Sequence, residues 1–358
     1  MASKADVDMP DLNDLGKRVR SLSGPVCGGA LIVCAAVLCG VVIGETSIGF
    51  DVVLKTLSNN FLGTALSVDP IESGLLWNYR LTRAIVAACC GAGLAISGVV
   101  LQALLRNALA EPYLLGISAG ASTGAVLATV AGLGGGAISL SAGAFAGALT
   151  AFGLVVTLAH FAGGSTAKHG SVQIVLAGIA GSQLFNALTA FIIAKSANAE
   201  QAKGIMFWLM GNLSGVRWPD VQVAAPVVIL GFIIIVWHAR YLDAFTFGTD
   251  AAASVGVPVR RVQAVLILTT ALLTAAMVSI VGSIGFVGLV IPHMARFLVG
   301  HSHGRLIPAA AVFGAVFLVF ADIASRILIP GQVLPIGVIT ALIGAPTFAL
   351  ILIRGQRT

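Results

Sequence analysis

The chain has 358 residues, of which 58% are apolar and 9% are charged. Soluble globular proteins carry about 25% charged residues, so this composition excludes a water-soluble protein. The net charge of +6 would suit a nucleic-acid-binding surface, but the basic residues stand singly at the ends of apolar runs instead of clustering. We therefore expect no nucleic-acid partner.

Residues 1–24 are polar and of mixed charge, and they predict a cytoplasmic N-terminal tail. The apolar run at residues 26–43 lacks the short basic start of a secretory signal, so it predicts a retained first span. From there apolar runs continue along almost the whole chain. Residues 25–358 are therefore expected to form a single transmembrane domain.

The apolar runs predict an all-α membrane protein. A helix needs about 20 apolar residues to cross a hydrocarbon core of about 30 Å. The apolar runs can also be counted as nine spans, which would place the two ends of the chain on opposite sides of the membrane. An even number places both ends on the same side. Our preferred assignment of about ten spans, the eighth of them short, is 26–43, 80–104, 113–133, 138–163, 172–194, 222–239, 262–281, 287–299, 306–328 and 334–353.

Lys and Arg are unevenly distributed between the two sides, and this bias sets the orientation of a membrane protein. With the N-terminus inside, the cytoplasmic segments carry Lys17, Arg18, Arg20, Arg106, Lys168, Arg240, Arg260, Arg261, Arg296, Arg305, Arg354 and Arg357. The outer segments carry Lys55, Arg80, Arg83, Lys195, Lys203, Arg217 and Arg326. The bias predicts that both termini are cytoplasmic.

Three less apolar stretches are long enough to form small substructures. Residues 45–79 predict an outer loop with an interfacial helix at 48–57. Residues 200–220 predict a short outer helix followed by a turn. Residues 242–261 predict an inner loop whose short helix ends at Gly256 and the proline that follows.

A glycine-rich stretch precedes the short eighth span. Gly282, Gly285 and Gly288 come three residues apart and are followed by Pro292. Irregular backbone at membrane depth is tolerated only where protein or a water-filled cavity covers it. The stretch therefore predicts a broken or re-entrant segment.

No catalytic motif appears. The chain lacks the Gly-x-x-x-x-Gly-Lys-Ser/Thr loop that cradles ATP phosphates, so any ATP that drives it is expected to bind another subunit. Paired catalytic acids and nucleophile elbows are absent too, so we expect that the chain is not an enzyme.

His301 and His303 do not share a helix face, and the five cysteines lie in predicted spans. We therefore expect neither a metal site nor a covalently bound cofactor.

The stretch RLTRAIVAACCGAGLAISGVVLQALLRNALAEPYLLGISAGAS, residues 80–122, is similar to the signature of the iron-siderophore, haem and cobalamin ABC permease family. The likeness continues through residues 207–220, 284–330 and 334–348 in the family's order. It implies a cobalamin-importer-like permease fold of about ten helices in the bacterial inner membrane. It also implies a homodimer that works with a cytoplasmic ATPase dimer and a periplasmic substrate-binding protein.

In that family, arginines on the outer face pair with glutamates of the binding protein. The family's Arg-Leu-Pro-Arg matches Arg80 to Arg83, with Thr82 in place of proline, and the last residue of its Ala-Asp-x-x-Ala-Arg matches Arg326. The resemblance thus implies that Arg80, Arg83 and Arg326 dock the binding protein. From the residue types alone, we would instead interpret these arginines as side chains that extend to the membrane–water interface. Asp322 and Arg326, four residues apart, would neutralise each other.

The inner loop 242–261 matches the place of the family's coupling helices. Its glycines and length are kept, but the family's Glu and Arg are missing. The resemblance implies contact with the ATPase through small and apolar side chains, and a bulky charge at Ala252 is expected to uncouple hydrolysis from transport. The matched residues are Gly248, Thr249, Asp250, Ala251, Ala252, Ala253, Ser254, Val255 and Gly256.

The family's inner gate lies at the turn after the second span and at the start of the fifth. Those places match Asn107 and Leu109, with Ala108 in place of the usual proline, and Ser171. The resemblance implies that Asn107, Leu109 and Ser171 form a cytoplasmic gate. The residue types alone predict a plain turn and a helix N-cap.

The resemblance allows haem, ferric siderophores and cobalamin as cargo. The predicted fifth span offers Ser182, Gln183, Asn186 and Thr189 but no fixed charge. A strongly anionic chelate would lose hydration there without a compensating cation. This favours haem or another iron chelate as cargo, with ferric siderophore or cobalamin as the alternative.

A protein of a different class, an ion-coupled secondary carrier, is the other hypothesis. Such a carrier would need acidic residues inside the membrane, and the spans hold almost none besides Asp322.

Overall fold

The computed structural model describes residues 12–130, 139–162, 170–196 and 198–355. Its elements are helical, and the only β feature in these ranges is an isolated bridge between Ile329 and Gln332. In chain order the elements are α1 (Leu12–Val42), α2 (Phe50–Leu62), α3 (Pro70–Leu75), the π-helical turn η1 (Leu76–Leu81), α4 (Thr82–Leu104), the 3₁₀ turn η2 (Pro112–Leu115), α5 (Ile117–Val130), α6 (Leu140–Phe161), α7 (Gly170–Ser196), α8 (Ala199–Leu209), α9 (Trp218–Trp237), α10 (Ala239–Phe245), α11 (Thr249–Ser254), α12 (Val259–Val281), α13 (Val287–Val299), α14 (His303–Ile327) and α15 (Ile336–Gly355).

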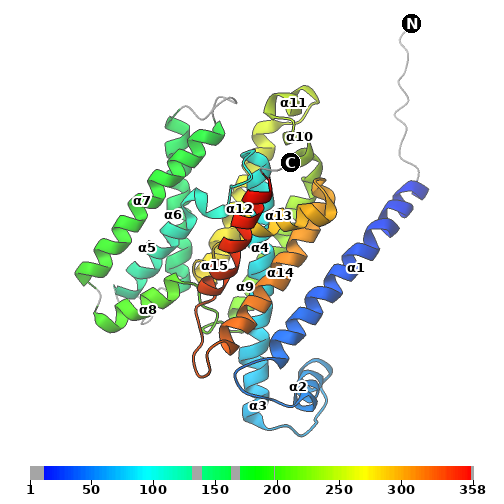
Figure 1. Ribbon diagram of the computed structural model, residues 1–358, viewed down its shortest axis with the longest axis vertical. Helices are drawn as coiled ribbons and strands as arrows, with labels where there is room; N and C mark the ends of the chain where they lie inside the picture. The colour runs from blue at the N-terminus through cyan, green and yellow to red at the C-terminus, as the bar shows by residue number, and fades with distance from the viewer. Residues whose placement is uncertain (1–11, 131–138, 163–169, 197, 356–358) are drawn as a thin grey trace.

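The long helices run between two ends of the molecule (Figure 1). We call the end that carries α2, α3 and α8 the α2 end, and the opposite end, with α10 and α11, the α11 end. Six helical stretches are long and apolar enough to cross a membrane, and four shorter apolar helices accompany them among the described residues. Each coincides with one predicted span, so the predicted all-α membrane architecture is confirmed.

Two element boundaries differ most from the prediction. Helix α1 begins at Leu12, within the predicted N-terminal tail. The second span belongs to a continuous helical stretch of 35 residues, Pro70–Leu104, which includes η1. Because Asp69 caps its N-terminus and Pro70 occupies the first helical position, this helix starts well before the apolar run.

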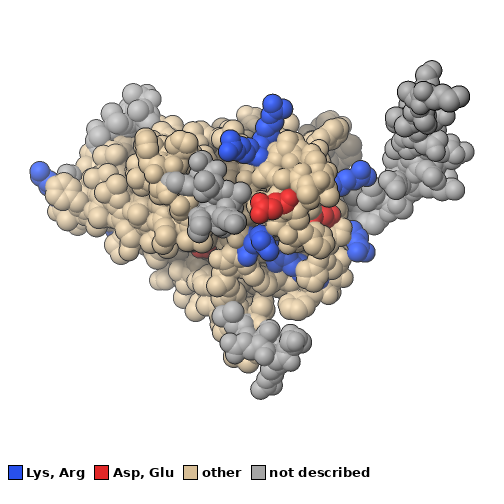
Figure 2. All heavy atoms as spheres, turned by 90° about the horizontal axis from the view of Figure 1, so that it is seen from above, with Lys and Arg blue, Asp and Glu red and all other residues tan. Residues whose placement is uncertain are grey.

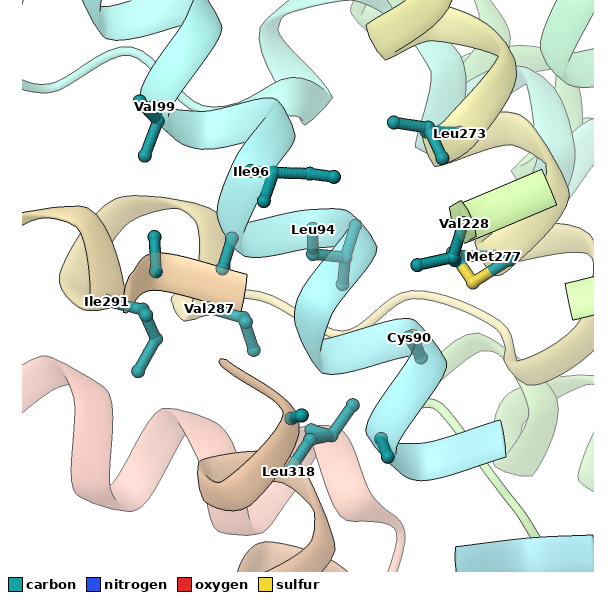
Figure 3. Packing of buried hydrophobic residues seen from close by; sticks show 14 of the residues in the cluster. Cys90, Leu94, Ile96, Val99, Val228, Leu273, Met277, Val287, Ile291 and Leu318 are labelled. Atoms are coloured by element: carbon teal, nitrogen blue, oxygen red, sulfur yellow. The ribbon is translucent and has the colours of Figure 1, made fainter. Parts of the chain in front are cut away.

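Helix α4 is the centre of the larger helix group. It packs against α9, α12, α13 and α14. Figure 3 shows Leu94 and Ile96 of α4 among Met277 of α12, Val287 of α13 and Leu318 of α14. Helices buried on all sides are apolar all round, as this one is.

Small residues permit the closest helix contacts. A Cβ added at Gly91 of α4 would lie 2.0 Å from the carbonyl oxygen of Gly314 on α14, and one at Gly98 would lie 1.9 Å from that of Gly288 on α13. Backbones that approach this closely gain dispersion contacts that lipid cannot replace. The glycines therefore set the spacing of α4, α13 and α14.

Helices α5, α6 and α7 form a second group beside the first (Figure 1). Gly124 of α5 meets Gly143 and Gly147 of α6, again at backbone distance. Helix α7 lies at the edge, where only 22% of its apolar window is buried. Its outward face is therefore free for lipid or for another chain.

The glycine-rich stretch is irregular, as predicted. Helix α12 ends at Val281, Gly282 and Phe286 adopt positive φ angles of 75° and 69°, and α13 starts at Val287. A Cβ at Gly282 would lie 2.1 Å from the carbonyl oxygen of Trp208, so only glycine fits. The break borders a cavity of about 460 Å³ that reaches α15.

The three predicted short helices are present. The first is α2 at Phe50–Leu62, longer than the expected 48–57. The second is α8, whose Asn198 and Gln201 form a capping box. The inner loop contains α11, which ends before Gly256 with its φ of 85°, and also α10, which was not predicted.

Candidate functional site

A buried charge cluster occupies the α2 end. Nε of Arg83 on α4 donates to Oδ1 of Asp322 on α14 at 2.6 Å. Nη2 of Arg326 lies 3.1 Å from the other carboxylate oxygen, an ion pair without hydrogen-bond alignment. All three side chains are 1% exposed. Two guanidinium groups therefore share one carboxylate away from water.

Arg83 makes three further hydrogen bonds through its Nη atoms. Nη1 donates to the hydroxyls of Tyr79 and Ser214, and Nη2 donates to Ser325 Oγ. Such charge-assisted hydrogen bonds offset part of the desolvation cost of a buried ion. The cluster thus links α4, α14 and the turn before α9.

Arg80 and Arg326 bind the end of α1. Nη1 of Arg80 donates to the carbonyl oxygens of Val41 and Val42. Arg326 donates through Nη1 to that of Ile43 and through Nη2 to that of Gly40. The last carbonyls of a helix lack intrahelical partners, and cations near this end are favoured by the helix dipole. Two arginines from other helices therefore cap α1.

The docking role of Arg80, Arg83 and Arg326 stays a prediction. All three lie at the α2 end, as expected for one common face, and all three are at most 2% exposed. The Asp322–Arg326 pair weighed from the sequence is present. What the sequence reasoning missed is Arg83, the second partner of Asp322, although a carboxylate inside a predicted span signals that a cation must lie nearby.

An aromatic row lies next to this cluster. The ring of Trp77 is 4.9 Å from that of Trp218, at the start of α9, and 5.2 Å from that of Phe61 on α2. Aromatic pairs at such distances add to the stability gained by burial. The row holds the projecting α2 against the helix bundle.

The predicted coupling segment projects from the α11 end (Figure 1). Ala251, Ala253, Ser254 and Gly256 are exposed, and Val255 is 74% exposed. Ala252 is 1% exposed and belongs to the large apolar core. The expectation that Ala252 faces a partner is therefore wrong, because α11 turns this one alanine inward.

Arg106 joins the predicted gate turn to the coupling segment. It follows α4 with a positive φ of 48°, a conformation that costs a residue with a Cβ about 1–2 kcal/mol. A Cβ at Gly248, just before α11, would lie 3.3 Å from its Nη1. The exposed Arg106 guanidinium thus lies directly against the start of α11.

The gate residues are only partly described. Asn107 forms a turn in which its side-chain oxygen accepts the N–H of Leu109 at 2.9 Å, and both residues are exposed. Helix α7 begins at Gly170, so Ser171 lies inside the helix instead of capping it. Its side chain is outside the described part of the chain, and the gate stays a prediction.

Asp243 of α10 holds the start of α14. Its Oδ1 accepts the backbone N–H of His303 at 2.8 Å and lies 2.7 Å from the Nδ1 of the same residue. Asp243 therefore acts as a capping carboxylate from another helix. His301 is exposed, and no group of three or more metal-binding side chains occurs among the residues described.

The polar residues of α7 point in different directions. Gln183 and Asn186 are exposed, whereas Thr189 is buried and its hydroxyl lies 2.7 Å from that of Thr123 on α5. The only charged side chain of α7 is Lys195, near its C-terminal end. The exposed face of α7 is therefore uncharged along most of its length.

Comparison with known proteins places these features in a family. Residues 31–354 match the FecCD transport family. The uncharacterized ABC transporter permease YvrB of Bacillus subtilis is 37% identical over 92% of this chain and 93% of its own length. The cobalamin import permease BtuC of Halobacterium salinarum is 40% identical, over 76% of this chain and 72% of its own length.

A solved structure has the same fold. It is described as an inward-facing conformation of a metal-chelate type ABC transporter, and it covers 92% of this chain and 98% of its own at a TM-score of 0.78 and 29% identity. Permeases of this type span the membrane several times and work with a separate ATPase subunit and a substrate-binding protein. The chain belongs to the FecCD transport family and is the permease subunit of an ABC importer.

Proposed function

We propose that this permease imports haem or another iron chelate from the periplasm to the cytoplasm, across the bacterial inner membrane. The observation that carries the proposal is the exposed face of α7, which presents Gln183 and Asn186 among apolar side chains and no fixed charge before Lys195 near its C-terminal end. The mostly apolar face of a porphyrin loses less hydration against such a wall than a strongly anionic chelate does. Ferric siderophores and cobalamin are the alternatives within the family.

The substrate is tested by transport. The permease is reconstituted in liposomes with its ATPase and binding protein, and ATP-dependent uptake of haem, a ferric siderophore and cobalamin is measured in parallel. Uptake of haem is the expected result. Uptake of a siderophore or cobalamin without uptake of haem would contradict the choice of substrate. It would not contradict the assignment of the chain to an importer.

A second copy of the chain completes the proposed pathway. The exposed apolar side chains of α7, among them Leu176, Leu184 and Phe191, need a cover of lipid or protein. In a single chain the face of α7 is open on one side. A second copy related by a two-fold axis would cover this face, and the two chains would enclose a pathway between them. Cross-linking of Asn186→Cys in membranes is expected to trap a dimer, and a monomer at all oxidant concentrations would contradict this arrangement.

In the proposed orientation, the α11 end lies in the cytoplasm. Exposed Arg106, Arg240, Arg260, Arg261 and Arg305 all lie at that end, and cytoplasmic loops are rich in such residues. Figure 2 looks onto this end and shows its basic groups spread around acidic ones. Reporter fusions after Gly44 and after Gly248 should report outside and inside, respectively, and two like signals would refute the topology.

The coupling segment then faces the ATPase dimer. Apart from Asp250, its exposed surface is made of small and apolar groups, so the contact is proposed to be mainly apolar. Ala253→Glu places a charge on this surface and is expected to uncouple ATP hydrolysis from transport while the helices stay folded. Ala199→Glu, at an exposed alanine of α8, is the matched control. Normal transport by the Ala253 variant would remove the coupling assignment.

Docking and gating complete the proposal. The α2 end receives the periplasmic binding protein, with Arg80, Arg83 and Arg326 as the docking arginines, and Asn107, Leu109 and Ser171 close the cytoplasmic side. An ion-coupled carrier is not retained, because family membership identifies an ATP-driven importer.

A further inference from the structure

An apolar groove lies where the two helix groups of Figure 1 meet. Helix α12 of the larger group packs against both α9 and α6, and side chains of all three helices line the groove. The groove encloses about 550 Å³, a volume typical of small-molecule sites. Its lining residues are distinct from those of the buried charge cluster, the glycine break and α7.

The sides of the groove are apolar and open to the surroundings. Val223, Leu230 and Leu272 line it and are 51%, 60% and 39% exposed. Thr269 and Ser279 also line it, but their hydroxyls donate to carbonyl oxygens of their own helix. Helices α6, α9 and α12 are each long and apolar enough to span the membrane. The medium that meets the groove is therefore the hydrocarbon of the bilayer.

The groove has about the depth of one lipid leaflet. On α9 its lining runs from Asp220 to Ile234, a rise of about 21 Å in an α-helix. One leaflet supplies half of a hydrocarbon core of about 30 Å, or about 15 Å. A lipid acyl chain that lies along the groove is thus covered over its whole depth, with its headgroup at the α2 end.

The groove is polar at its α2 end and carries charges of both signs there. Asp220, in the first turn of α9, and Ser141, in the first turn of α6, line it. Arg217, three residues before Asp220, is exposed, and its backbone N–H donates to Asp220 Oδ2 at 2.8 Å. Neither charged side chain forms an ion pair within the described ranges. A carboxylate and a guanidinium one turn apart match the ammonium and phosphate groups of an amine-bearing phospholipid.

We propose that the groove binds an acyl chain of phosphatidylethanolamine, with the ammonium group against Asp220 and the phosphate near Arg217. The bound lipid fills the seam between the two helix groups. Phosphatidylglycerol with the same acyl chains gains the same apolar contacts, but it offers no ammonium group to the carboxylate. The inference goes beyond the proposed function and is independent of the cargo and of the orientation in the membrane.

The test measures lipid binding to the delipidated full-length permease by native mass spectrometry, with phosphatidylethanolamine and phosphatidylglycerol of identical acyl chains. The wild type is expected to bind phosphatidylethanolamine about fivefold more tightly, because a charge-assisted hydrogen bond is gained. Asp220→Asn keeps an acceptor for the N–H of Arg217 but removes the charge, and the preference should fall below about twofold. Glu200→Gln removes an exposed carboxylate of α8 at the same end and should leave the preference unchanged.

A second pair of variants tests the groove itself. Val223→Trp places a large ring in the groove and is expected to weaken binding of both lipids about fivefold without changing the preference. Ile229→Trp is the control, because Ile229 is 57% exposed on the same helix but does not line the groove. Elution volume and unfolding temperature report whether each variant is folded, and Ala142→Leu, also in the groove lining, replaces Val223→Trp if that variant is not.

Three results would overturn the inference. They are equal affinities of the wild type for the two lipids, a preference that survives Asp220→Asn, and an equal loss of binding in Val223→Trp and Ile229→Trp. Retention of detergent with neither lipid bound would overturn it as well.

Discussion

The two ends of α14 use charge in opposite ways. At the α2 end, Asp322 is buried with Arg83 and Arg326 in a cluster that joins three helices. At the α11 end, Asp243 has a 42% exposed side chain and caps α14 through His303. Arg106, Arg240, Arg260, Arg261 and Arg305 of that end lie on the surface. Charge is part of the core at one end and part of the surface at the other.

This contrast changes how a count of basic residues is interpreted. Arg80, Arg83 and Arg326 were counted with the outer segments, yet they are buried among helices. The exposed basic residues of the α2 end are then fewer than the sequence suggested. Variants that remove a charge from each end test whether the contrast is real.

The largest effect is expected for Asp322→Asn. Two buried guanidinium groups would lose their shared carboxylate, and breaking a buried ion pair costs about 3–5 kcal/mol. Thermal unfolding of the detergent-purified protein should show a large loss of stability. The matched control is Asp250→Asn on the exposed α11, which should change stability by less than about 0.5 kcal/mol. Similar unfolding temperatures for the two variants would show that the cluster is not structural.

Arg80→Ala is expected to have the next largest effect. It leaves the carbonyls of Val41 and Val42 without this donor, and a hydrogen bond from a charged group contributes about 1.5–3 kcal/mol. Hydrogen exchange in residues 40–49 should accelerate. Arg240→Ala, an exposed arginine of α10, should leave exchange near its own helix almost unchanged. Unchanged exchange in both variants would argue against the capping of α1.

Gly91→Ala tests the close contact that links the two ends. The added methyl group would collide with the carbonyl oxygen of Gly314, and overpacking costs about 1–3 kcal/mol. Gly153→Ala on α6 is the control, since nothing lies within 4 Å of its added Cβ. There the better helix propensity of alanine should stabilise the protein by up to about 1 kcal/mol. Opposite shifts in unfolding temperature are expected, and shifts of the same sign would contradict the packing.

The smallest effect is expected for Asp243→Ala. It removes the acceptor for the backbone N–H of His303, and loss of a helix cap costs about 1 kcal/mol. Hydrogen exchange should accelerate in the first turn of α14 and remain unchanged at Asp322. Asp250→Ala serves as the control on α11. If exchange accelerated along all of α14, the two ends would not be independent.

The sequence by itself determined the membrane architecture of this protein. About 20 consecutive apolar residues suffice to form a span, and each predicted span coincides with an apolar helix. The short eighth span followed from the length of its apolar run, and the break before it and the end of the inner short helix followed from glycine and proline. These are local signals, which depend on residues close together in the chain.

Only the tertiary structure decided which charged and small side chains are buried. Arg83 and Asp322 are 239 residues apart in sequence, and no periodicity pairs them. Ala251, Ala252 and Ala253 are the same residue type, yet only Ala252 packs into the core. Arg217 and Arg83 are both arginines near the same end, and one is exposed while the other is buried. Burial depends on which helices lie side by side, because partners brought from distant parts of the chain either surround a side chain or leave it open.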